Sequence, residues 1–401
     1  MKIRFFNTYE PVSPLYRDLF PALLEQGAEI EVVISKAEYR KGRDLIGRFQ
    51  QTPGIRFIRT IHLGKHAYQG AWAKVLVMVL YAIHGALYAL FGPGVDKNVF
   101  LTQPPFFTTL GVLLSKLRGQ PYYWITMDIQ PEMSVALGLE SQDALWTRFS
   151  KWLSMLAFRH AAGIIVIGRC MKKRVQTMGI EEQRIHVIPN WADEREIYPI
   201  PHHQNPLRRD QQWGDKFVVL YAGNIGIPQY FDDLLDVAGA LKHRDDILFV
   251  FIGDGARKEK LAQRVVQDQL TNVQLLPFLH EKYSLAEILS SGDVHFISLQ
   301  EGCTGYAVPS KTYAALASGR PILFQGGADS EIVQMMKEID VGFFVPSGDV
   351  AALQQAIERL ASNEALRIRL GNNARQTILT TYSRDAAIKK YLNVLLKGEP
   401  N

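Results

Sequence analysis

This chain of 401 residues contains only two cysteines, and its first residues show no apolar leader segment. Its two cysteines, Cys170 and Cys303, lie far apart, which argues against a disulfide framework and against closely spaced metal ligands. The first residues run directly into a predicted strand and contain no signal-peptide core. We therefore expect the protein to reside in the cytoplasm.

Glycine is missing from the first predicted strand-to-helix turn, residues 7–11, which lies where open α/β sheets bind ligands. This excludes a glycine-rich dinucleotide-binding fingerprint at that turn.

Long uncharged runs are also rare. Residues 75–91 carry no charge, but they are only just long enough to span a bilayer, and His84 and Gly85 interrupt them. We rank a core helix first, a helix in a membrane interface second and a transmembrane helix last.

The charge that is present is unevenly distributed. Residues 1–200 hold 24 Lys and Arg against 17 Asp and Glu, and the remaining residues hold 21 against 23, from totals of 45 and 40. A basic first half fits an anionic ligand or an anionic membrane surface, although it fits a merely soluble domain nearly as well. Nucleic acid is not an expected partner, because the basic residues are scattered and are not interleaved with aromatic ones.

The hydrophobic content of 47% supports two full cores. Predicted strands and helices alternate along both halves, which indicates α/β architecture with parallel sheets. We expect two doubly wound, Rossmann-like domains that face each other across a cleft. The expected ranges are 1–198 with a returning helix at about 384–401, a linker at 199–215, and 216–383.

The most informative stretch is 308–324, which predicts a loop, a short helix and a buried strand. Ser310 is a good helix N-cap, and Gly319 lies where a helix end needs positive φ. Lys311 in the first turn adds a cation to the free N–H groups of the helix start. This combination predicts an anion site, although an ordinary crossover helix with a surface lysine would show the same pattern.

Five segments together carry a family resemblance: 187–193, 221–226, 251–255, 318–322 and 343–349. Each is weak alone, but their order and predicted structure resemble retaining glycosyltransferases of the GT-B fold, family 4. The similarity covers nearly the whole chain and is strongest from 160 to 350. Residues 128–132 resemble the branch that builds bacterial surface polysaccharides.

The resemblance implies transfer of a sugar from a nucleotide diphosphosugar, UDP- or GDP-linked, with retention and without a metal or other cofactor. The chain accordingly has no D-x-D triplet. The expected acceptor is a glycan, a lipid-linked molecule or a small molecule, and peripheral contact with the inner face of an anionic membrane is among the expected interactions. By position, the resemblance implies catalytic Asp128, Glu301 and Lys311; donor-binding Gly223, Asn224, Gly226, Gly253, Asp254, Phe278, Thr304, Gly305, Tyr306, Ser310, Lys311 and Thr312; and acceptor-side Asn7, Tyr9 and Glu10.

The chain also departs from the family pattern. Ala314 stands where the family has a second glutamate, and Asn224 and Gln229 lie where an Arg and a Lys are usual. Met127 replaces a common histidine. Our hypothesis is that Lys311 supplies the missing phosphate-binding charge.

These departures leave two alternatives open. One is a GT-B subunit that binds a nucleotide without catalysis. The other is a sugar-nucleotide epimerase, which needs acid and base pairs of carboxylate and histidine. Of the histidines, His280 and His295 lie in or near the ligand loops predicted for the second domain.

Overall fold

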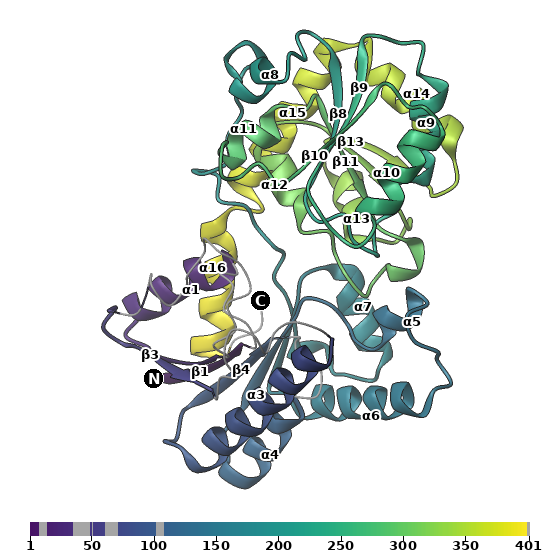
Figure 1. The fold of residues 1–401 in the computed structure, drawn as a ribbon. Coiled ribbons are helices and arrows are strands. Elements are labelled where there is room, and N and C mark those ends of the chain that lie inside the picture. The colour runs from purple at the N-terminus through teal and green to yellow at the C-terminus, as the bar shows by residue number, and fades with distance from the viewer. Residues whose placement is uncertain (8–13, 35–48, 50, 61–70, 102–107, 399–401) are drawn as a thin grey trace. The chain divides into compact units, whose positions relative to one another are not determined.

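The computed structural model describes residues 1–7, 14–34, 49, 51–60, 71–101 and 108–398. The chain divides into two compact units (Figure 1), each treated separately below. Unit 1 comprises Met1–Ile188 and the segment from Ile388 onward, and unit 2 comprises Pro189–Ala387. Both units are α/β, so the predicted fold class is confirmed.

The segment expected to be a linker, 199–215, belongs to unit 2 and is packed against it. The Asn205 side chain accepts hydrogen bonds from the N–H groups of Leu207 (3.0 Å) and Arg208 (3.2 Å). Leu207 and Arg208 are both buried, and Arg208 donates to Asp293 at 3.1 Å. These residues of the segment therefore bond within unit 2.

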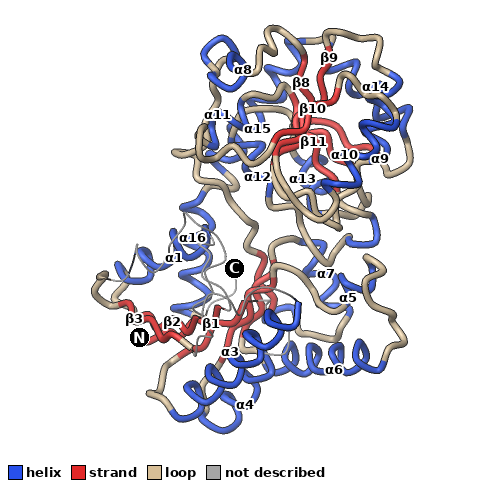
Figure 2. The backbone as a smooth tube through the Cα atoms, viewed as in Figure 1, coloured by secondary structure: helices blue, strands red, loops and turns tan. Residues whose placement is uncertain are grey.

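Unit 1 is built on a seven-stranded parallel sheet with the order β3-β2-β1-β4-β5-β6-β7. The first strand of the chain lies inside the sheet, and later strands are added on both sides of it (Figure 2). The strands are β1 (Lys2–Asn7), β2 (Glu29–Ile34), β3 (Ile55–Arg59), β4 (Lys97–Leu101), β5 (Tyr122–Thr126), β6 (Gly163–Val166) and β7 (Ile185–Val187).

Helices connect these strands, and the chain returns to unit 1 at its end. There Lys97 donates to the carbonyl oxygen of Leu395 at 2.7 Å, which attaches the returning segment to the sheet. The helices of this unit and of the return are α1 (Pro14–Glu25), α3 (Ala71–Phe91), α4 (Thr108–Arg118), α5 (Glu132–Ala136), α6 (Leu145–His160), α7 (Arg169–Thr177), η2 (Glu182–Arg184), α16 (Arg384–Leu392) and η5 (Asn393–Lys397).

The apolar segment 75–91 lies in α3, which buries one side and exposes the other. Tyr81 and Ala89 are buried, whereas Ile83 and Leu87 are half-exposed. The first-ranked interpretation, a core helix, is therefore right for only one face. Among the described residues, no helix has the length and apolar character needed to cross a bilayer.

Unit 2 has a six-stranded parallel sheet in the order β10-β9-β8-β11-β12-β13. Its first strand again lies in the interior of the sheet. The strands are β8 (Phe217–Ala222), β9 (Ile247–Ile252), β10 (Val273–Leu276), β11 (Val294–Ser298), β12 (Ile322–Gln325) and β13 (Gly342–Val345). The helices are η3 (His202–Gln204), α8 (Pro206–Asp210), α9 (Asp232–Ala240), α10 (Lys258–Gln267), α11 (Leu285–Ser290), η4 (Glu301–Cys303), α12 (Lys311–Ala317), α13 (Glu331–Glu338), α14 (Val350–Ala361) and α15 (Glu364–Thr380).

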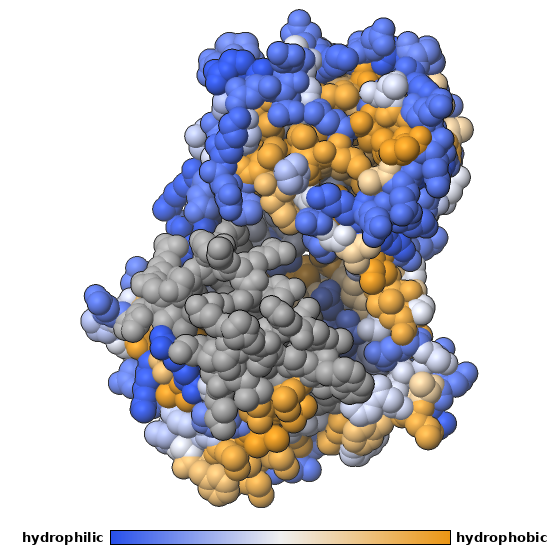
Figure 3. Space-filling model, viewed as in Figure 1, coloured by the Kyte–Doolittle hydropathy of each residue, from blue (hydrophilic) through white to orange (hydrophobic). Residues whose placement is uncertain are grey.

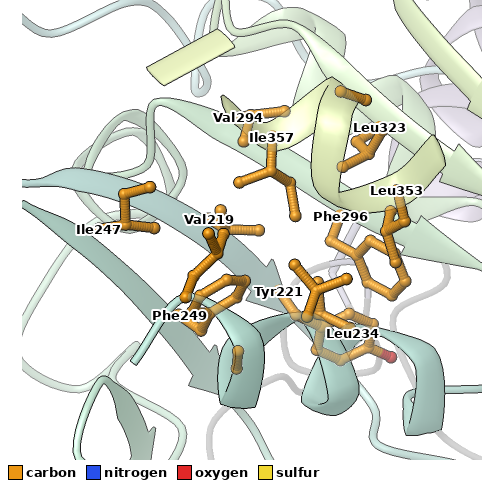
Figure 4. Close-up of a cluster of buried hydrophobic side chains, with 14 of the residues drawn as sticks. Val219, Tyr221, Leu234, Ile247, Phe249, Val294, Phe296, Leu323, Leu353 and Ile357 are labelled. Atoms are coloured by element: carbon orange, nitrogen blue, oxygen red, sulfur yellow. The ribbon is translucent and has the colours of Figure 1, made fainter. Parts of the chain in front are cut away.

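The core of unit 2 lies between one face of this sheet and the helices that cover it. Alternate residues of β8, such as Val219 and Tyr221, point to that side because side chains alternate along a strand. They pack with residues of the neighbouring strands and of α9 and α14, as Figure 4 shows. This packing fixes the carboxyl ends of β8 and β11. The loop that begins at Gly223 follows β8, and the loop that leads to Lys311 follows β11.

Candidate functional site

The strand order of unit 2 places two loops beside each other. β8 pairs with β9 on one side and with β11 on the other, so the connections from β8 and β11 leave the sheet in opposite directions. Ligands of open α/β sheets bind at the carboxyl ends of strands where the order reverses in this way. The loop that begins at Gly223 and the loop that leads to Lys311 flank that position.

A contact between Lys311 and Tyr221 joins the two loops. The lysine Nζ lies 3.8 Å from the centroid of the Tyr221 ring and donates to the hydroxyl group of the same side chain. A Cβ atom added to Gly223 would lie 3.7 Å from that Nζ. The ammonium group therefore sits at the switch point of the sheet, against the backbone of the glycine loop.

Burial acts strongly on this amine. It lowers the pKa of Lys311 from 10.5 to about 7, because removal from water disfavours the charged form. Within the described part of the chain, no carboxylate lies within ion-pair distance of Lys311. A cation–π contact with tyrosine contributes only about 0.5–2 kcal/mol. The site therefore holds an amine whose charged form an incoming anion would stabilise.

Glycines let the two first loops of unit 2 approach each other. Gly223 N–H donates to Ile252 at 2.9 Å, and Ile225 N–H donates to Asp254 at 2.8 Å. Gly253 has φ +153°, and a Cβ atom there would lie 1.9 Å from the carbonyl oxygen of Gly223. No side chain fits in that space, so Gly253 is required for the close packing of the two loops.

The start of α12 differs from its prediction. Ser310 already has helical backbone angles (φ −61°, ψ −27°), and its hydroxyl group makes no capping hydrogen bond. The expected Ser310 cap is therefore wrong, because a residue in this conformation does not direct its side chain to the first-turn N–H groups. The N–H group of Thr312 donates instead to Pro309 at 3.2 Å. Gly319 has the predicted positive φ, at +66°.

The loop before α12 offers fewer free backbone N–H groups than its predicted role in donor binding would suggest. The N–H group of Tyr306 donates to Cys303 at 3.0 Å, so it is committed within the loop. The N–H group of Gly305 has no acceptor among the described residues, and Gly305 has φ +81°. The hydroxyl groups of Thr304 and Thr312 are buried, and the described residues give them no partner. These groups are the remaining polar atoms of the predicted donor loop.

The loop from Asn224 to Gln229 stabilises itself. Gly226 N–H donates to the Gln229 side chain at 2.9 Å, and Tyr221 O–H donates to the carbonyl of Asn224. Arg257 donates to the carbonyl of Gln229 at 2.8 Å. The sequence patterns assign no role to Tyr221 or Arg257. Tyr221 lies in a predicted core strand, and Arg257 is 28 residues away from Gln229 in the sequence.

Three further predicted donor residues lie on the surface of unit 2. Glu301 is exposed in η4, and Asp254 is exposed and accepts from Gly255 N–H at 2.8 Å. Phe278 is exposed beside His280, with ring centroids 6.0 Å apart. No contact between these residues and Lys311 is seen in the described structure. The structure thus joins Lys311 with the glycine loops but leaves these three outside that contact.

In unit 1, Asp128 follows the end of β5 at Thr126. Burial raises its pKa from 3.8 to about 6, so this carboxyl group titrates close to neutral pH. A carboxyl group perturbed in this way is typical of functional sites, although structural positions also produce such shifts. Asn7 ends β1, opposite Ile34 of β2. Tyr9 and Glu10 lie outside the described residues.

His295, one candidate for acid–base chemistry, is a core residue of β11. Its Nε2 atom lies 3.0 Å from the Leu289 carbonyl oxygen and 3.2 Å from the Ser318 hydroxyl group. Burial lowers the pKa of His295 to about 4. A neutral, enclosed imidazole does not serve the epimerase alternative.

Two family models together match most of the chain. Residues 14–191 match the glycosyl transferase 4-like domain, and residues 204–377 match the glycosyl transferases group 1. Among similar proteins, WbjE of Pseudomonas aeruginosa, named a probable glycosyltransferase, is 27% identical over 293 residues, 72% of each chain. WcaI of Escherichia coli, named for colanic acid biosynthesis, is 23% identical over 72% of this chain and 71% of its own.

Solved structures show the same fold. HepE of Anabaena, in complex with UDP-glucose, superposes with a TM-score of 0.70 at 16% identity, over 99% of this chain and 100% of that one. A sucrose-phosphate synthase from Thermosynechococcus elongatus gives 0.75 at 16% identity, over 99% and 98%. The chain is therefore an enzyme of the GT-B glycosyltransferases and belongs to family 4.

Proposed function

We propose that this glycosyltransferase transfers a sugar, with retention and without a metal ion, from a UDP- or GDP-sugar to a glycan or lipid-linked acceptor in bacterial surface-polysaccharide synthesis. We also propose that the reaction takes place in the cytoplasm. The observation that carries the proposal is Lys311: a buried amine beside Gly223, at the switch point of the sheet, with no carboxylate partner among the described residues. A nucleotide diphosphate brings the negative charge that this position lacks.

In the proposed reaction, the bond between the anomeric carbon and the diphosphate oxygen breaks, and both electrons leave with the diphosphate. The acceptor oxygen forms the new glycosidic bond and loses its proton. Negative charge grows on the leaving group in the transition state, and a preorganised cation stabilises it there more than in the ground state. Lys311 supplies that cation. The Gly305 N–H group and the hydroxyl groups of Ser310 and Thr312 are the proposed hydrogen-bond donors.

Other residues have proposed roles on either side of the diphosphate. We propose that the nucleotide contacts the glycines of the loops at 223–226 and 253–255, together with Asn224 and Asp254. Phe278 is proposed to contact the base, and Glu301 to contact the donor sugar. Asp128 is proposed to act near the transferred sugar, where a carboxyl group with a pKa of about 6 can exchange a proton at neutral pH.

The relatives support the donor class without deciding it. HepE has been solved with UDP and with UDP-glucose, and it shares the fold at low identity. WcaI is named for colanic acid biosynthesis and LpsD of Rhizobium meliloti for lipopolysaccharide core biosynthesis, and these names favour a glycan product.

Two measurements test the proposal. The first is a thermal-shift screen of UDP, GDP, ADP and their sugars, since a ligand that binds only the folded state raises the melting temperature. The second is donor hydrolysis or transfer with the best ligand. Lys311→Ala should abolish turnover, while Lys282→Ala, which removes an exposed amine paired with Asp210 in the same unit, should leave it unchanged. Near-normal turnover of Lys311→Ala would refute the proposed role. Ligand binding without turnover of the wild-type chain would indicate a subunit that binds without catalysis.

A further inference from the structure

An exposed apolar stripe runs along α3. Leu76, Val79, Ile83, Leu87 and Phe91 follow helical spacing, and each is between 46% and 82% exposed. The opposite side of the helix is attached to the sheet, where Tyr81 donates to the Val33 carbonyl at 3.2 Å and Tyr88 donates to Glu31. These hydrogen bonds fix the orientation of α3, so its apolar stripe faces away from the core of unit 1.

The stripe continues on two further helices. α4 contacts both α3 and α6, and it exposes Leu113 and Leu117 one turn apart. α6 exposes Leu145 and a row of three aromatic rings, in which Phe149 lies about midway between two tryptophans. The Phe149 ring centroid is 6.1 Å from that of Trp146 and 6.0 Å from that of Trp152. Figure 3 shows the apolar residues gathered over α3 and α4.

Together these exposed residues of α3, α4 and α6 are called the α3–α4–α6 surface. Scattered exposed apolar residues are normal, but a contiguous group on three adjacent helices indicates an interaction site. Tryptophans with an apolar body and a polar N–H group favour the boundary between lipid chains and water.

Charge decides which partner this surface fits. The three helices contain no Asp or Glu, and they carry six Lys or Arg. Lys116, Arg148, Lys151 and Arg159 are exposed. One of these cations has an acidic partner, since the Oε1 atom of Glu132 is 3.9 Å from the Lys151 Nζ, and Glu140 accepts from Thr147 of α6 at 3.2 Å. A second copy of the chain, docked symmetrically, would bring like charges together. Anionic headgroups would instead neutralise them.

We propose that the α3–α4–α6 surface docks unit 1 on an anionic phospholipid bilayer, with the apolar stripe entering the interface and the basic side chains contacting headgroup phosphates. The helices would lie on the membrane rather than cross it. This docking does not depend on the reaction proposed above, and it is measured without a sugar nucleotide.

The test is co-sedimentation of the full chain with vesicles of phosphatidylcholine alone and of phosphatidylcholine with an equal amount of phosphatidylglycerol. The wild type should bind the anionic vesicles and bind less in high salt. Arg148→Gln with Lys151→Gln should weaken binding about 25-fold, from about fivefold for each cation. Ile83→Glu with Leu117→Glu and Trp152→Glu should weaken it at least about tenfold. Val266→Glu, which alters an exposed apolar residue of α10 in unit 2, should bind like the wild type.

Circular dichroism melts establish that each variant is folded, and the doubly substituted glutamine variant tests the surface even where the apolar variant is unstable. Equal binding of the wild type to neutral and anionic vesicles, or no binding to either, would overturn the proposal. So would a wild-type dimer, detected by light scattering, that the apolar variant separates while vesicle binding is absent. That last result would make the surface a contact between copies.

Discussion

The ammonium group of Lys311 rests on the face of the Tyr221 ring, 3.8 Å from its centroid, and donates to the hydroxyl group of that same ring. Both residues lie at the switch point of the unit 2 sheet, one at the start of α12 and the other near the end of β8. An aromatic face and a neutral hydroxyl group compensate a buried charge only in part. The position is therefore suited to receive an anion.

Binding of a nucleotide diphosphate should take up a proton. The pKa of Lys311 is lowered to about 7, so at a pH of about 8 most of this amine is neutral in the free protein. A bound diphosphate favours the charged form and raises the pKa, so nearly one proton should bind with each UDP or GDP. Calorimetry in two buffers of different ionisation enthalpy measures this uptake. Lys311→Met should bind with little uptake, and equal uptake by both proteins would assign the proton elsewhere.

Replacing Lys311 should stabilise the fold while removing turnover. The pKa of an unfolded lysine is about 10.4, so between pH of about 7 and 10 the unfolded chain binds more protons than the folded one. Wild-type stability should therefore rise with pH across this window. Below a pH of about 7, the folded state bears the whole free-energy cost of burying the charged amine. Lys311→Met should be more stable by about 1–2 kcal/mol near pH 7, with a gap that shrinks toward pH 10. Urea unfolding at several pH values measures this. A less stable Met variant at neutral pH would contradict it.

Gly253→Ala should disrupt both the fold and nucleotide binding. The new Cβ atom would lie 1.9 Å from the Gly223 carbonyl oxygen, so the two loops must separate. We expect a loss of about 3 kcal/mol or more and no thermal shift with UDP or GDP. Gly214→Ala is the matched control, because Gly214 also has positive φ (+54°) but open space around it. It should lose only about 1 kcal/mol and keep binding. Similar losses for the two variants would show that the loop contact is unimportant.

Asp128→Asn should separate stability from activity in unit 1. The folded pKa of Asp128 is raised to about 6, above the unfolded value of about 3.9, so the wild type loses stability as pH rises through this interval. The Asn variant lacks this loss and should be more stable by about 1–2 kcal/mol at pH of about 7. Its turnover should fall by at least about a hundredfold if Asp128 acts near the sugar. Thermal melts from pH 4 to 8 and a transfer assay, both at fixed protein concentration, give the two readouts. Parallel pH profiles of the two proteins would contradict the raised pKa.

Local patterns predicted much of unit 2. Gly319 takes positive φ as its place after a short helix required, and the glycines at 223 and 253 lie at strand ends as the apolar runs indicated. Ser310 was misjudged because serine before a helix usually caps it, whereas here Pro309 accepts the first-turn bond from Thr312.

Long-range relationships were beyond the sequence. Alternation of strands and helices does not say on which side of the sheet each new strand is added, so the pairing of β11 with β8 was not predicted. That pairing is what brings Lys311 against Tyr221. The sequence patterns also singled out none of the residues of α6, and only their exposure in the structure reveals the α3–α4–α6 surface. The predicted roles of Glu301 and Phe278 remain proposals, because the structure links neither to Lys311.

A crystal structure of the chain with an intact UDP- or GDP-sugar tests the central claim most directly. We expect a β-phosphate oxygen about 2.8 Å from the Nζ atom of Lys311, with the amine drawn away from the Tyr221 ring. Phosphates bound elsewhere, with Lys311 still on that ring, would contradict the account.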